Sequence, residues 1–164
     1  MADYPETLAE RLANEGVKTC VFFSAIPEAG WQHAVYAAAT VWTVRQVLAH
    51  FVSAEFAFAC LFEDILAGGS GAPQDFDIDA FNQQEVTGLM EVEPLELLEQ
   101  FRRLRQENVA LVAKMKPADL LRRGRHPFLG NVELVEMVKL LYRHNQIHQR
   151  DVRRALAELY ETNA

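Results

Sequence analysis

The sequence has too few cysteines and too little positive charge for several classes of protein. Its two cysteines, Cys20 and Cys60, do not make a disulfide framework in a chain of 164 residues. Both lie in apolar stretches, where we expect buried thiols. The 16 Lys and Arg residues are outnumbered by 23 Asp and Glu residues, which gives a formal net charge of −7. An acidic surface disfavours binding to nucleic acid phosphates, so we expect no nucleic acid partner.

Long hydrophobic runs and a recognisable leader are also lacking. No segment reads as a membrane span, which needs roughly 20 apolar residues, and the N-terminus shows no basic start followed by an apolar block. We therefore expect no membrane partner and a cytoplasmic protein. Hydrophobic residues make up 50% of the chain, which is enough for a core, and the length predicts one domain over residues 1–164.

Strand-like alternation of apolar and polar residues is scarce, and helical spacing dominates instead. Long helices are predicted over about 5–26, 43–67, 94–115 and 132–160, with a shorter one over 78–90. The segments 27–39 and 121–131 are expected to be irregular connections. About 27 residues separate the second and third long helices. The sequence thus predicts an all-α four-helix bundle with a long crossover between helices 2 and 3. Core candidates on the first helix are Leu8, Leu12, Val17, Val21 and Phe22.

Three histidines in the predicted helices form the strongest candidate site. His144 and His148 are four residues apart, which places them one turn apart on one face of the last long helix. His50 lies on the second long helix. At about 100° per residue, all three fall at the edges of apolar stripes, so they can meet in a groove between helices. Three imidazoles with an open coordination position are typical of a catalytic metal site. The alternative is three half-buried, hydrogen-bonded side chains.

Two better-known metal signatures are absent. A zincin helix needs His-Glu-x-x-His, with the Glu as general base, and position 145 is Asn. Di-iron bundles need Glu three residues before a histidine on two helices. The residues three before the helical histidines are Val47, Leu141 and Asn145. A mononuclear three-histidine site is what remains.

Other polar residues near these histidines have open roles. Asn145 and Gln149 fall inside the buried stripe of the last helix, where they would orient ligands, bind substrate or link helices. Glu55 is either a carboxylate that supports the site or a surface residue. His33 and His126 are expected to be non-ligands, although His126 could line the mouth of a pocket.

Three sequence blocks carry a resemblance to a known family. They are Val-Trp-Thr-Val-Arg-Gln-Val-Leu-Ala-His at 41–50, His-Pro-Phe-Leu-Gly at 126–130 and His-Asn-Gln-Ile-His-Gln at 144–149. Their order and spacing resemble those of the DinB/YfiT-like superfamily of metalloenzymes, and the segment 77–82 is also similar. The resemblance implies a four-helix bundle in which His50, His144 and His148 hold one divalent metal ion, nickel or zinc.

The resemblance also implies an activity. Some members of the family are thiol S-transferases that use bacillithiol, mycothiol or glutathione, and one branch isomerises maleylpyruvate with mycothiol. It implies a metal-dependent transferase that joins a low-molecular-weight thiol to an electrophilic small-molecule substrate. A metal-dependent hydrolase and a non-catalytic bundle that binds a ligand or partner stay open as alternatives. The basic residues Arg122, Arg123 and Arg125 could meet an anionic thiol.

A homodimer is expected as well, because dimers are common in the family that the chain resembles. Leu140 and Ile147 face away from the main apolar stripe of the last helix. They are candidates for a second buried surface or a dimer contact.

Overall fold

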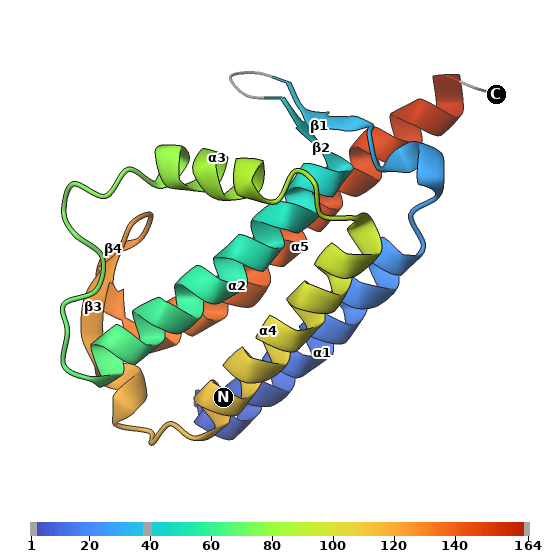
Figure 1. Ribbon diagram of the computed structural model, residues 1–164. Helices are drawn as coiled ribbons and strands as arrows, with labels where there is room; N and C mark the ends of the chain where they lie inside the picture. The colour runs from blue at the N-terminus through green and yellow to red at the C-terminus, as the bar shows by residue number, and fades with distance from the viewer. Residues whose placement is uncertain (1–2, 38–40, 163–164) are drawn as a thin grey trace.

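The fold is a bundle of four long helices with a fifth, shorter helix beside it (Figure 1). It comes from a computed structural model that describes residues 3–37 and 41–162. The long helices are α1 (Pro5–Ser24), α2 (Val44–Leu66), α4 (Pro94–Ala113) and α5 (Leu134–Thr162), and α3 (Ile78–Gly88) lies in the crossover. This architecture confirms the predicted all-α four-helix bundle with a long crossover between its second and third long helices.

The crossover sets the direction of the helices. α1 and α5 run one way along the bundle, and α2 and α4 run the other way (Figure 1). Each long helix packs against two others, in the cyclic order α1, α4, α2, α5. Because α2 and α4 are parallel neighbours, residues 67–93 must return along the length of the bundle before α4 can begin. α3 and its flanking loops do this on the outer side of α2.

The helices begin where local sequence chemistry favours it. Pro5 and Pro94 occupy the first turn of α1 and α4, where a missing backbone N–H leaves no hydrogen bond unmade. Thr43 and Gln46 form a capping box at α2: the Thr43 side chain accepts from the Gln46 backbone N–H, and the Gln46 side chain accepts from that of Thr43. Asp77 accepts from the Ala80 backbone N–H at α3. These caps explain why the predicted helix starts agree with the structure.

The buried face of α1 differs from the prediction. Leu8 and Leu12 are buried as expected, but Val17 and Val21 are 64% and 65% exposed. The buried stripe also includes Pro5 and Ala9, continues through two small residues, Gly16 and Thr19, and ends at Phe23. The prediction followed the large apolar side chains, whereas this part of the interface needs room for polar groups from α4 and α5.

Two short hairpins replace connections that were predicted to be irregular. β1 (Ala34–Tyr36) pairs with β2 (Trp42–Thr43), and β3 (Arg123–His126) pairs with β4 (Gly130–Glu133). The predicted irregular stretch 27–39 also contains the short 3₁₀ helix Glu28–Gly30, while residues 38 and 39 lie outside the described part of the chain. Strands of two to four residues are too short to show an alternating pattern of apolar and polar residues, so they were not predicted from the sequence.

A polar layer crosses the middle of the bundle between two apolar clusters. One cluster holds Leu12, Phe62 and Leu141, and the other holds Phe23, Phe51 and Phe101. The layer between them is built from buried polar side chains of all four long helices: Thr19, His50, Ser53, Glu55, Arg105, Asn108, Asn145 and Gln149. Buried polar groups need partners, so the layer restricts how the four helices can align.

Helix α2 corrects the expectation that no segment is apolar enough to span a membrane. By length and composition alone, Val44–Leu66 would suffice, but 61% of its most apolar window is buried inside the protein. It also carries Glu55, whose side chain is fully buried. A helix covered on this scale by its own protein is typical of a core helix.

The crossover is attached to the β3–β4 hairpin by backbone hydrogen bonds. Arg125 N–H donates to Ser70 C=O, and Ala72 N–H donates to Arg125 C=O, each at 2.8 Å. Between them, Gly71 has φ +83°, and a Cβ atom there would lie 2.5 Å from the Arg125 carbonyl oxygen. Only glycine meets both demands without strain. The attachment holds the first part of the crossover against the end of α2.

Candidate metal centre

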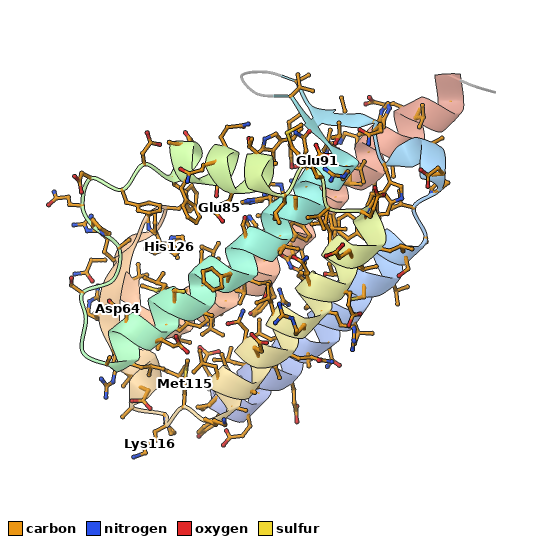
Figure 2. The ribbon with its side chains drawn as sticks, viewed as in Figure 1. Asp64, Glu85, Glu91, Met115, Lys116 and His126 are labelled. Atoms are coloured by element: carbon orange, nitrogen blue, oxygen red, sulfur yellow. The ribbon has the colours of Figure 1, made fainter. Side chains whose placement is uncertain are left out.

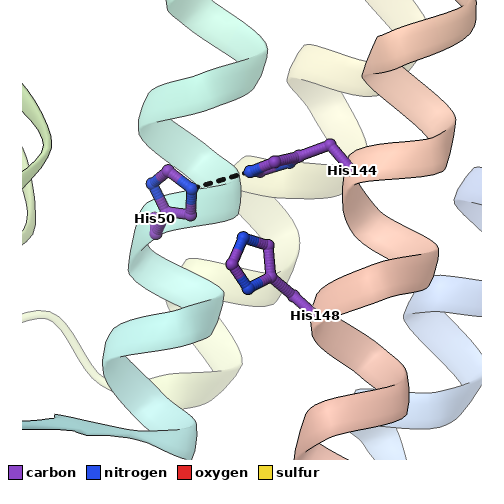
Figure 3. Close-up of side chains that lie close together, drawn as sticks. All are labelled: His50, His144 and His148. Atoms are coloured by element: carbon purple, nitrogen blue, oxygen red, sulfur yellow. Dashed lines mark hydrogen bonds between the residues drawn. The ribbon is translucent and has the colours of Figure 1, made fainter. Parts of the chain in front are cut away.

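The structure brings together the three histidines that the sequence singled out. His50 projects from α2 and His144 and His148 from α5, and their rings face one another (Figure 3). One ring nitrogen from each lies within 4.8 Å of the other two, and the Nε2 atoms of His50 and His144 are 2.8 Å apart. The antiparallel contact of α2 and α5 produces this meeting, because it places the edges of their two apolar stripes side by side.

Hydrogen bonds orient the two α5 histidines. The Tyr36 hydroxyl donates to Asp151 Oδ2 at 2.8 Å and also lies 2.6 Å from His148 Nδ1. A hydroxyl has a single hydrogen, so His148 Nδ1–H must donate to Tyr36, which leaves the lone pair of His148 Nε2 free. His144 Nδ1 lies 3.2 Å from Asn145 Oδ1. Because this amide oxygen can only accept, His144 Nδ1–H donates to it, and the lone pair of His144 Nε2 is available.

The supporting roles of Tyr36 and Asp151 were not predicted from the sequence. Asp151 is three residues after His148 on the same helix face, and that spacing was a usable signal. Tyr36 comes from β1, and no sequence pattern links it to α5. Support of this kind for a metal-binding histidine is common, and it fixes both the tautomer and the ring orientation.

The three nitrogens fit a divalent cation. Burial lowers the pKa of each imidazole: well below the usual value at His50, to about 3 at His144, and in the same direction at His148. Neighbouring histidine charges add to the effect at His50 and His144. The rings are therefore neutral, as metal ligation requires. Neutral imidazole suits zinc and nickel alike. His50 Nδ1 is buried without a hydrogen-bond partner in the described structure.

The other polar residues considered with the site serve different purposes. Gln149 Nε2–H donates to Thr19 Oγ1 at 2.8 Å and so links α5 to α1. Glu55 is neither a surface residue nor a contact of the histidines, because its carboxylate accepts from Arg105 and Asn108 of α4. Of the candidates left open, Asn145 alone contacts a histidine of the cluster.

A cavity of about 720 Å³ opens beside the histidines. We call it the histidine cavity, and it lies between α2, α5, the crossover and the β3–β4 hairpin. Its lining includes all three histidines, and most of the rest is apolar: Trp42, Ala54, Phe56, Ala57, Phe58, Leu61, Ala72, Pro73, Phe76, Ile78, Phe81, Pro127, Phe128, Leu140 and Ile147. A volume of this size is typical of a site for a small organic molecule.

Several predictions about the residues around the cavity need correction. Cys60 was expected to be a buried thiol, but it is exposed on the wall of the histidine cavity. Arg122, Arg123 and Arg125 were considered as partners for an anionic thiol. The Arg122 guanidinium instead donates to Asp119 and Leu66 C=O, and that of Arg123 donates to Asn131 C=O. None of the three arginines is among the described residues that line the cavity.

His126 lines the histidine cavity at a distance from the three-histidine cluster. It sits at the end of β3 and, like Asp64 at the end of α2, on the side of the bundle along which the crossover runs (Figure 2). Its Nδ1 accepts from the backbone N–H groups of Phe128 and Leu129, at 3.0 and 3.2 Å. Burial lowers its pKa to about 4. His126 thus lines a pocket, as the sequence suggested it could, and it lies outside the cluster of His50, His144 and His148.

Acid is expected to destabilise the protein through His126. Its folded pKa of about 4 lies below its ordinary value of 6.5, so the folded state binds fewer protons than the unfolded state between these pH values. The stabilisation is present above about pH 6.5 and is lost as the pH falls towards 4. Allowing for solvent in the cavity, we expect a loss of ~1–2 kcal/mol from this group. NMR titration of the His126 ring measures its folded pKa, and a midpoint near 6.5 would contradict the prediction. Urea unfolding at pH 7 and pH 4.5 measures the total loss, to which His50, His144 and His148 add in the same direction.

The chain is similar to one protein family and to several solved structures. The family model described as the DinB superfamily matches residues 18–152. YfiT from Bacillus subtilis, described as a probable metal-dependent hydrolase with an unusual four-helix bundle topology, is 16% identical, with a TM-score of 0.77 over 94% of this chain and 87% of that one. An uncharacterized protein from Clostridium difficile 630 is 13% identical, with a TM-score of 0.73 over 94% and 96%. Among curated proteins, none matches the sequence.

A further structural relative corrects the predicted partners. The colibactin self-resistance protein ClbS was solved in complex with a dsDNA; it is 12% identical, with a TM-score of 0.74 over 95% of this chain and 97% of that one. The expectation that nucleic acid is not a partner is therefore wrong as an expectation for this fold. It rested on net charge, which describes the whole surface and does not describe a local binding face.

Proposed function

The chain belongs to the DinB superfamily, and from that membership and the three converging histidines we propose that it is a metal-dependent enzyme. We propose His50, His144 and His148 as the ligands of one divalent cation, with nickel or zinc as the candidates. The reaction we propose is the transfer of a low-molecular-weight thiol to an electrophilic small molecule.

The observation that carries this proposal is the opening of the histidine cavity onto the cluster. A structural metal site is closed by a fourth protein ligand, whereas a catalytic site keeps a coordination position open. The cluster has three histidines within 4.8 Å of one another, and all three also line the cavity. A small molecule in the cavity can therefore reach the point that the three nitrogens face.

The residues of the chain have separate tasks in this reaction. A cation bound there would supply positive charge that lowers the pKa of a bound thiol or water. Tyr36 and Asp151 hold His148 in the tautomer that presents Nε2 to the cluster. Phe51, whose ring centre lies 5.8 Å from that of His144 and 5.9 Å from that of His148, excludes water on the side of the bundle core. In the net reaction, the thiol proton leaves to solvent, sulfur bonds to the electrophilic carbon, and the leaving group departs with the electron pair of the broken bond.

Hydrolysis is the second candidate, because YfiT is described as a probable metal-dependent hydrolase. Hydrolases of the zincin type use a carboxylate near the metal as general base. In the described structure the side chains hydrogen-bonded to the cluster are those of Tyr36 and Asn145. Burial and the Asp151 carboxylate raise the pKa of Tyr36, so neither of these two is a base near neutral pH. The Asp151 carboxylate itself accepts the hydrogen bond of the Tyr36 hydroxyl, which lies between it and His148. This favours a thiol, whose proton is lost more readily than that of water.

The two candidates are separated by one set of assays. Purified protein without a histidine tag is loaded with zinc or nickel and mixed with an electrophile such as monochlorobimane and a panel of thiols. We expect conjugation at least ~100-fold above the rate with metal-free protein, the scale of a modest catalytic effect. Cleavage of a model ester without thiol would support the hydrolase instead. No metal-dependent turnover with any substrate would favour the non-catalytic binding module. Duplex DNA is titrated in a separate arm because of ClbS.

A further inference from the structure

The Asp, Glu, Lys and Arg side chains that line the histidine cavity are all acidic. Of its described lining residues, none is Lys or Arg, and two are carboxylates, Asp64 and Asp79. Asp64 is engaged, since its Oδ2 accepts from the Gly71 N–H at 2.9 Å. Asp79 lies in the exposed first turn of α3. A ligand body with a negative charge would lose its hydration here and find no cation from the wall to replace it.

The apolar part of the wall is unusually open. Phe56, Phe76, Phe128 and Ile147 are 58%, 37%, 75% and 49% exposed, and all four line the cavity. They come from α2, the crossover, the β3–β4 turn and α5. Side chains of this kind, gathered from four segments around one opening, indicate a binding site and not scattered surface residues. The cavity is continuous with the histidine cluster, so its occupant is a small molecule that reaches into it.

His126 supplies a fixed hydrogen-bond donor in this apolar wall. Its Nδ1 accepts two backbone N–H groups, so Nδ1 carries no hydrogen. A neutral imidazole then carries its hydrogen on Nε2. The ring packs against that of Phe58, with the ring centres 5.3 Å apart and the ring planes inclined by 31°, which holds it against the wall. Because His126 also lines the cavity, it offers an N–H donor to an acceptor on the ligand.

From these features we propose that the histidine cavity takes neutral, aromatic or alkyl molecules with a carbonyl-type acceptor that His126 Nε2–H engages. This inference rests on the proposed function and names its substrate class. The electrophile, and any thiol whose body enters the cavity, would carry no carboxylate or phosphate there. His126 is then a specificity-determining residue that acts apart from the three-histidine cluster.

Three matched ligands test the proposal: benzophenone, diphenylmethane, which lacks the carbonyl, and 4-benzoylbenzoate, which adds a carboxylate. Their affinities for metal-free protein are measured by displacement of the neutral fluorescent probe N-phenyl-1-naphthylamine. We expect benzophenone to bind ~5–10-fold more tightly than diphenylmethane, the value of one hydrogen bond, and at least ~10-fold more tightly than 4-benzoylbenzoate. An equal or reversed order in either comparison would overturn the proposal.

Variants locate the binding. Ala57→Trp places an indole in the cavity and should weaken all neutral ligands at least ~10-fold, whereas Val21→Trp, on the exposed face of α1, should not. His126→Leu should equalise benzophenone and diphenylmethane. If that variant does not fold, nitrogen NMR of His126 in the native protein serves instead, and an Nδ1–H tautomer would refute the donor. Unchanged affinities in Ala57→Trp would also refute the proposal.

The metal is measured separately in the same preparations. Metal uptake with no preference for neutral ligands would contradict the proposed substrate class but not the proposed metal-dependent function. Preferential binding of neutral ligands without metal uptake would contradict the metal-dependent function but not the substrate class. Probe binding that is lost as the protein associates at higher concentration would show that a second copy covers the apolar wall, and that would overturn the small-molecule occupant.

Discussion

Replacing His50 or His148 by alanine is expected to lower the affinity for a divalent cation by ~100-fold or more. Four-ligand structural zinc sites bind with about 10–16 kcal/mol, or roughly 3 kcal/mol for each ligand, and 1.4 kcal/mol corresponds to a factor of ten. Both side chains lie in the cluster whose nitrogens are within 4.8 Å of one another. Untagged wild-type protein should take up about one equivalent of zinc or nickel. Elemental analysis after dialysis and competition with a chromophoric chelator measure both quantities.

Two further variants make this result specific. His33→Ala removes a histidine that precedes β1 and lies outside the cluster, so its metal affinity should equal that of the wild type. Tyr36→Phe keeps all three histidines but removes the acceptor of His148 Nδ1–H and should cost ~10–100-fold. Retention of a full equivalent of tightly bound metal by both alanine variants would rule out the three-histidine site. So would the absence of stoichiometric metal from the wild type.

Two features of the site could be predicted from the sequence: the spacing of residues along one helix, and the angular position of a residue on each of two helices. The i, i+4 spacing of His144 and His148 and the position of His50 at the edge of its stripe needed only helical geometry. Their meeting also required α2 and α5 to be neighbours, which followed from the resemblance and not from the spacing. Tyr36 was missed because its contact with α5 spans 112 residues in sequence and joins a strand to a helix.

The errors in burial share one physical origin: apolar residues were taken as the marker of burial. On α1 the buried positions at the level of the polar layer are Gly16 and Thr19, whereas Val17 and Val21, which were predicted to be buried, are exposed. At Cys60 an apolar helix was taken as buried, although that side faces the cavity. The hairpin 123–133 is held by backbone pairing and by its contacts with the crossover, which leave no trace in side-chain periodicity. Residue type predicts a face well only where the neighbouring surface is itself apolar.

The polar layer should dominate the stability of the bundle, and Arg105→Leu is expected to lower the free energy of unfolding by ~3–5 kcal/mol. The Arg105 and Glu55 side chains are 3% and 0% exposed and form an ion pair. Arg105 Nε donates to Glu55 Oε2 at 3.0 Å, and Nη1 donates to Leu12 C=O at 3.1 Å, so one guanidinium joins α4 to α2 and α1. Removing it leaves a buried carboxylate and a buried carbonyl without this partner, and uncompensated buried charge costs that much.

The local shape of α1 shows how closely the arginine fits. A Cβ atom at Gly16 would lie 2.7 Å from Arg105 Cγ, so the absence of a side chain makes room for the stem of Arg105. Sequence alone gave no reason to place a charge there, since buried arginine is rare unless paired. Glu55, left open as a supporting carboxylate or a surface residue, is the partner that makes the arginine tolerable.

A double-variant cycle separates the cost of a broken pair from the value of the pair. Glu55→Leu should cost about as much as Arg105→Leu, while the double variant should recover much of the loss, because neither charge is then left alone. Arg102→Leu is the matched control: Arg102 lies one turn earlier on α4 and pairs with Glu99, but the two side chains are 51% and 62% exposed. An exposed pair is worth at most ~1 kcal/mol. Urea unfolding of the four variants measures the set, and equal losses for Arg105→Leu and Arg102→Leu would contradict a structural role for the polar layer.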